Sequence, residues 1–101
     1  MARAVAIQDK TQQLLSRAED AVLASIKTID EAKKAGISDE QLKPARTLHR
    51  QAQWRLDFIA AENSFGFHAP QEAARILAEA IDLGRQGETA AARMQIKTAK
   101  E

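Results

Sequence analysis

Apolar residues recur every three or four positions along three stretches of the chain, which is the spacing of one face of an α-helix. The stretches cover about 3–35, 38–64 and 70–97. This pattern predicts an all-α fold with three helices in an extended antiparallel arrangement. The apolar positions expected to face the core are Leu15, Ala18, Val22, Ile26, Ile29, Leu48, Ala52, Leu56, Ile59, Ala60, Ala73, Ile76, Leu77, Ala80 and Ile81.

The junction between the first two helices carries local signals for a helix end and a new helix start. Gly36 suits the position just after a helix end, where the backbone often adopts a left-handed conformation. Ser38 and Gln41 match a capping box, in which each side chain bonds the other residue's amide. Ile37 and Leu42 occupy the two positions of a hydrophobic staple. These signals predict a tight turn and a helix start at about residue 38.

Three residues weaken the predicted helices from inside. Pro44 removes one backbone hydrogen bond near the start of the second helix, so we expect a kink or a separate first turn there. Gly84 and Gly87 weaken the third helix, because glycine is a poor helix former. Apolar residues then continue the helical pattern at Ala90, Ala91, Met94 and Ile96.

Composition supports this fold class and limits the size of the core. The 101 residues suffice for one domain, and alanine supplies 21 of the 45 hydrophobic residues, so only 24 are larger. An alanine methyl contributes little buried area. We therefore expect the chain to pack against a second copy of itself or against a larger body.

Charge and residue usage exclude several functional classes. The net charge is +1 without a basic face, which argues against nucleic-acid binding. The sequence holds no run of the roughly 20 apolar residues that a membrane span needs, and residues 1–8 lack the apolar core of a secretory signal. The absence of cysteine excludes disulfides, thiol catalysis and covalent haem attachment through this chain's own residues.

The two histidines are the first candidates for a chemical role. His68 lies between Phe67 and the start of the third helix, where a neutral imidazole could ligate a metal or haem iron. The residues alone favour an ordinary histidine that is partly buried and bonded to a backbone carbonyl. For His49, in mid-helix beside Arg46 and Arg50, we expect a solvated helix face.

Trp54 and Arg55 place a large aromatic ring beside a guanidinium group. Arg55 could pair with a carboxylate or a propionate, although a core or interface tryptophan flanked by surface charges is the simpler interpretation. Glu62, Glu72 and Glu79 are interpreted as scattered carboxylates on helix surfaces. The residues alone therefore indicate no catalytic arrangement, and we expect the isolated chain to be inactive.

Several of these residues form a recognisable series. The run Gln-Ala-Gln-Trp-Arg-Leu-Asp-Phe over 51–58 is followed by Gly-Phe-His-Ala-Pro-Gln-Glu over 66–72 and Arg-Ile-Leu over 75–77. This series resembles the C-terminal helical region of the pentahaem, ammonia-forming cytochrome c nitrite reductase. The resemblance covers roughly 7–88. Leu56 and Phe67 depart from the family's usual tryptophan and methionine, and both replacements are apolar.

The resemblance implies a specific role. His68 would be the distal axial ligand to one bis-histidine haem, with the haem c groups and calcium carried by the remainder of a parent enzyme that reduces nitrite to ammonia in the periplasm. Residues 1–101 would be a single C-terminal segment that contacts the parent haem domain and forms a homodimer through its long helices. On this interpretation the chain is an excised segment that begins after the last haem-binding motif.

Two other interpretations remain open. The chain could be a stand-alone helical interaction module without haem, in which His68 is an ordinary residue at a helix start. It could also belong to a related multihaem oxidoreductase that acts on hydroxylamine or tetrathionate.

Overall fold

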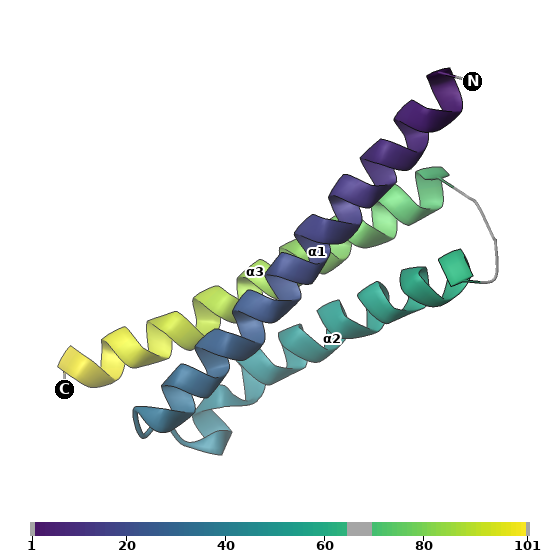
Figure 1. Cartoon of the computed structure of the whole chain (residues 1–101). Helices are drawn as coiled ribbons and strands as arrows, with labels where there is room; N and C mark the ends of the chain where they lie inside the picture. The colour runs from purple at the N-terminus through teal and green to yellow at the C-terminus, as the bar shows by residue number, and fades with distance from the viewer. Residues whose placement is uncertain (1, 65–69, 101) are drawn as a thin grey trace.

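A computed structural model describes residues 2–64 and 70–100 of the chain. It contains helix α1 over Ala2–Lys34, α2 over Asp39–Ser64 and α3 over Pro70–Lys100, with no strand in the described ranges (Figure 1). The predicted all-α class is confirmed. The bounds agree closely with the predicted ones, except that α3 continues three residues further than expected.

The three helices form an elongated bundle. α2 runs antiparallel to α1 and α3, and α3 packs along both, most extensively along α1 (Figure 1). The molecule measures 58 × 21 × 17 Å, so its long axis follows the helices. The extended antiparallel arrangement is therefore confirmed.

The turn between α1 and α2 has the geometry that its sequence predicts. Gly36 has a φ of 97°, and the amide of Ile37 donates to the carbonyl of Ala32 at 3.0 Å, which is a Schellman motif. The amide of Gln41 donates to Ser38 Oγ at 3.1 Å, and the amide of Ser38 donates to Gln41 Oε1 at 3.1 Å. The capping box is thus confirmed, and α1 and α2 are joined by a defined turn.

Pro44 does not divide α2. The helix continues from Asp39 to Ser64 with Pro44 inside it, so no separate first turn forms. A proline leaves only one carbonyl without its usual amide donor, here that of Glu40. Because Glu40 is exposed, water can satisfy this carbonyl.

Alanine supplies six of the thirteen buried residues in the two clusters that make up the core. The first cluster joins all three helices in the half of the bundle where α2 ends, and the second lies beside the α1–α2 turn. The first contains Ala18, Val22, Ala52, Leu56, Ile59, Leu77 and Ala80. The second contains Ile29, Ala32, Ile37, Leu42, Ala45 and Ala91.

Gly84 and Gly87 lie where α3 packs closely against α1 and α2. A Cβ placed on Gly84 would stand 2.9 Å from the backbone carbonyl carbon of Ala21 in α1. A Cβ on Gly87 would stand 3.3 Å from the carbonyl oxygen of Ala45 in α2. Both glycines are buried, and α3 is continuous through them. Their missing side chains therefore allow close backbone packing.

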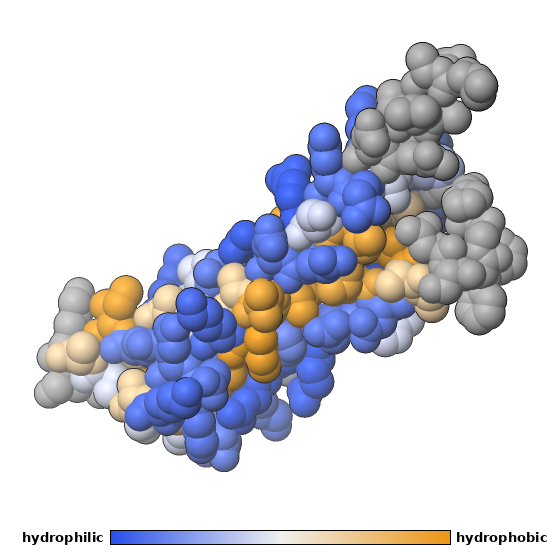
Figure 2. Space-filling model, in the orientation of Figure 1, coloured by the Kyte–Doolittle hydropathy of each residue, from blue (hydrophilic) through white to orange (hydrophobic). Residues whose placement is uncertain are grey.

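Two residues assigned to the core by periodicity are exposed instead. Ile26 is 44% exposed, and Ala60 is also on the surface. In α1 the fully buried Ser25 takes the inward position that the pattern predicted for Ile26. Figure 2 accordingly shows an oblique band of hydrophobic surface, flanked by hydrophilic side chains, on the face that α1 crosses.

Candidate functional site

His68, the predicted haem ligand, lies outside the described residues. α2 ends at Ser64 and α3 begins at Pro70, so these two helices bring the chain to one end of the bundle on either side of His68. The axial-ligand role of His68 stays a prediction at this point.

His49 does not lie on a solvated helix face, so this expectation is wrong. Its ring is half-buried, and its Nδ1 lies 2.6 Å from the hydroxyl oxygen of Ser25 in α1. The Ser25 hydroxyl donates to the carbonyl of Val22 at 2.7 Å, which leaves its oxygen free to accept from His49 Nδ1–H. The prediction failed because a buried serine on another helix leaves no signal in the sequence around residue 49.

Burial lowers the pKa of His49 below its ordinary value. Removal of the imidazolium from water is the largest cause, hydrogen bonding to the Val22 backbone opposes it, and the nearby Arg50 charge adds to the lowering. The hydrogen bond to Ser25 persists in both charge states, because neutral His49 with Nδ1–H and the imidazolium are both donors. At neutral pH, His49 is therefore an uncharged link between α1 and α2.

This pKa shift makes the stability depend on pH. The unfolded chain takes up the His49 proton near pH 6.5, whereas the folded chain takes it up only at lower pH. The free energy of unfolding therefore falls as pH drops below about 6.5 and through the native pKa. We expect His49→Gln to reduce this fall, as measured by urea unfolding at pH 7.5 and 5.5.

The matched control for this prediction is Ser25→Ala. It removes the hydrogen-bond partner but leaves a titratable, half-buried imidazole at position 49, so the fall in stability should persist. Equal pH dependence in the parent chain and His49→Gln would contradict the assignment to His49.

Trp54 is not a core residue. It is 63% exposed, and its ring stacks on that of Phe58, with centroids 5.5 Å apart and an interplanar angle of 16°. Phe58 is 39% exposed. α2 thus presents two adjacent aromatic rings to the outside of the bundle.

The charged residues near this pair are organised, which corrects their interpretation as scattered carboxylates. Arg55 Nε donates to Glu79 Oε2 at 3.0 Å, and Arg75 Nη1 donates to Glu79 Oε1 at 2.8 Å. Arg75 also donates to Glu72. Of the two partners considered for Arg55, the structure shows a carboxylate, that of Glu79. The Arg55 hydrogen bond is the main cause that lowers the pKa of Glu79.

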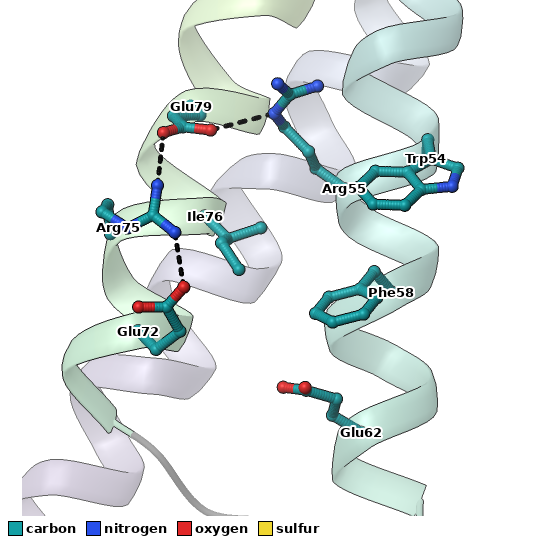
Figure 3. Close-up of a pocket in the computed structure, with 8 residues that line it drawn as sticks. All are labelled: Trp54, Arg55, Phe58, Glu62, Glu72, Arg75, Ile76 and Glu79. Carbon is teal, nitrogen blue, oxygen red and sulfur yellow. Dashed lines mark hydrogen bonds and ion pairs between the residues drawn. The ribbon is translucent and has the colours of Figure 1, made fainter.

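These groups surround a hollow of about 300 Å³ between α2 and α3 (Figure 3). It is lined by Trp54, Arg55, Phe58, Glu62, Glu72, Arg75, Ile76 and Glu79. The sequence gives the helical spacing of these residues on each helix but not the register between α2 and α3, so the hollow could not be predicted.

The part of the chain that the structure describes holds no cluster of side chains suited to a metal ion. Within 2–64 and 70–100, no three histidine, cysteine, aspartate or glutamate side chains are grouped to hold a metal ion. The sequence has no cysteine to form the thioether bonds of haem c. None of the helices in the same ranges is long and apolar enough to cross a membrane.

The family model and the relatives that match this chain carry the same name, cytochrome c552. The family model for cytochrome c552 matches residues 1–101. A cytochrome c-552 of Parabacteroides distasonis is 36% identical over 90 residues, or 89% of this chain, and one of Bacteroides thetaiotaomicron is 34% identical over the same length. A cytochrome c-552 of Aliarcobacter butzleri is 38% identical over 75% of the chain.

These relatives are much longer than this chain. The matched region is 18% of the Parabacteroides and Bacteroides proteins and 16% of the Aliarcobacter protein. No solved structure matches the chain significantly.

The assignment to the pentahaem nitrite reductase is corrected by these comparisons. The family model and the relatives carry the name cytochrome c552, and none of these relatives is named a nitrite reductase. The two groups are related, so the series from Trp54 to His68 indicated a haem protein but led to the wrong family name. The chain belongs to the cytochrome c552 family, a family of haem electron-transfer proteins.

Proposed function

We propose that this chain is a helical segment of a haem c electron-transfer protein. In this proposal it supplies His68 as an axial ligand to a haem that is anchored by polypeptide outside these 101 residues. Two findings support it together: the cytochrome c552 family model matches the whole chain, and the chain contains no cysteine to attach a haem.

The choice of His68 follows from the side chains available. Histidine and methionine are the usual protein ligands of electron-transfer haems. His49 donates its Nδ1–H to Ser25 and is half-buried between helices, and Met94 packs against the second core cluster. His68, Ala69 and Pro70 belong to the series of residues whose resemblance indicated a haem protein.

A bound haem would supply reversible one-electron chemistry through its iron. The contribution of this chain would be to hold one imidazole in place, which favours the low-spin state and adjusts the reduction potential. The long helices α2 and α3 support the two ends of the segment that carries His68.

A haem peptide with a single proximal histidine tests this role directly. Titration with the chain should convert the ferric peptide from the high-spin to the low-spin absorption spectrum, because His68 fills the open axial position. We expect His68→Ala to abolish the conversion and His49→Gln to retain it.

The opposite pattern would reject the proposal. A low-spin spectrum that persists in His68→Ala, or that is lost in His49→Gln, would assign the ligand to another side chain. Circular dichroism of both variants checks that the helices are intact.

We also propose that the segment forms a homodimer in a periplasmic protein. Proteins of this family are typically secreted, which supports that location. The elongated shape, the alanine-rich core and the exposed apolar residues of α1 support self-association.

A further inference from the structure

The hollow between α2 and α3 combines exposed aromatic rings with a half-buried carboxylate, that of Glu62. Trp54 and Phe58 form one wall and Ile76 lies opposite, on α3. Figure 3 shows Phe58 and Glu62 pointing from α2 toward α3, with α1 behind both helices. The hollow therefore opens on the side of the bundle away from α1.

The two arginines of the hollow are already neutralised. Both oxygens of Glu79 accept hydrogen bonds, one from Arg55 and one from Arg75. Arg55 also donates to the carbonyl of Gln51, and Arg75 to Glu72. These contacts leave little positive charge to attract an anion such as a carboxylate.

Glu62 gives the hollow an excess of negative charge. Its carboxylate is half-buried and forms no hydrogen bond or ion pair with residues 2–64 or 70–100. With Glu72 and Glu79, the lining has three carboxylates and only two guanidinium groups. A cation that enters would meet an aromatic face and a free carboxylate together, and each attracts positive charge.

We propose that this hollow binds an arginine side chain presented by a partner polypeptide. The planar guanidinium would stack against the Trp54–Phe58 pair while its N–H groups donate to Glu62. Arginine suits this site better than lysine, because its flat, weakly hydrated head group stacks on rings and pairs with a carboxylate through two bonds. The proposal does not depend on haem binding or on the role of His68.

Trp54 is the only tryptophan of the chain, so its fluorescence reports directly on the hollow. Titration with N-acetyl-arginine amide should change this fluorescence with saturation, whereas sodium propionate should not. We expect Glu62→Gln to weaken binding of the arginine probe about three- to fivefold, which corresponds to the loss of one partly exposed ion pair.

Glu31→Gln is the matched control, because Glu31 is an exposed carboxylate on α1 that lies outside the hollow. It should leave the affinity for the probe unchanged. A response without saturation, equal affinity in Glu62→Gln, or preferential binding of propionate would overturn the proposal. A fluorescence change on diluting the chain alone would instead assign the hollow to contact between two copies.

Discussion

Replacing Gly84 with alanine is expected to destabilise the chain by about 1–2 kcal/mol. In a typical helix interior the same replacement would stabilise by about 1 kcal/mol, because alanine is the better helix former. Here the new Cβ would lie 2.9 Å from the Ala21 carbonyl carbon and 3.0 Å from its oxygen. These are backbone atoms that cannot rotate away, so α1 and α3 must separate. The thermal midpoint measured by circular dichroism should fall by roughly 5–15 °C.

Two further variants separate this packing effect from helix propensity. Gly87→Ala gains the same propensity but meets its nearest atom, the Ala45 carbonyl oxygen, at 3.3 Å. Its destabilisation should therefore be smaller than that of Gly84→Ala. Adding Ala21→Gly to Gly84→Ala should restore little stability, because backbone contacts remain after the Ala21 methyl is removed. A midpoint that stays equal or rises in Gly84→Ala would contradict the close contact.

The helices and their ends could be predicted because their causes are local. Gly36 and the pair Ser38–Gln41 act within a few residues of the chain, and each forms the bonds that its position implies. Pro44 is also a local signal, but no separate first turn forms there, and the carbonyl that loses its amide is at an exposed residue. Local signals thus gave the number, length and direction of the helices.

The register between helices could not be predicted, and it decides which side chains meet. Ser25 contributes no apolar surface to the periodic pattern, yet it is fully buried and hydrogen-bonded to His49 on the next helix. Ile26, one position further, is left at the surface. Gly84 was interpreted as a weak point of α3, whereas it allows the backbones of α1 and α3 to pack closely. Each of these errors concerns contacts between residues distant in the sequence.

The candidate hollow depends on the same kind of long-range contact. Arg55 and Glu79 are 24 residues apart in sequence and form a hydrogen bond at 3.0 Å. From the sequence, Glu72 and Glu79 looked like isolated surface charges, and Arg55 was only one possible partner for a carboxylate. The α2–α3 register turns these residues into a network that neutralises both arginines and in which, among the described residues, Glu62 has no partner.

Self-association through α1 is the second large effect that we expect. Leu23 is 66% exposed and Ile26 is 44% exposed, and residues three apart share one helix face. If two copies of α1 cross in antiparallel fashion about Leu23, Glu19 of each copy faces Lys27 of its partner, because each is four residues from the centre. Glu19 and Lys27 are exposed and form no ion pair with the described part of the same chain. A two-fold dimer would thus pair opposite charges on both sides of an apolar centre.

Leu23→Glu should therefore weaken the dimer about a hundredfold in sedimentation equilibrium, because it removes two buried leucines, each of which contributes about 1.5 kcal/mol or more. Ile96→Glu is the matched control: Ile96 is 57% exposed on α3, outside the predicted contact, so the dimer should persist.

Lys27→Glu should also weaken association by placing like charges together, and the double variant Glu19→Lys with Lys27→Glu should restore it. A parent chain that stays monomeric at all concentrations would reject the dimer. A double variant that stays as weak as Lys27→Glu would reject the antiparallel register, because only that pairing brings residues 19 and 27 of two copies together.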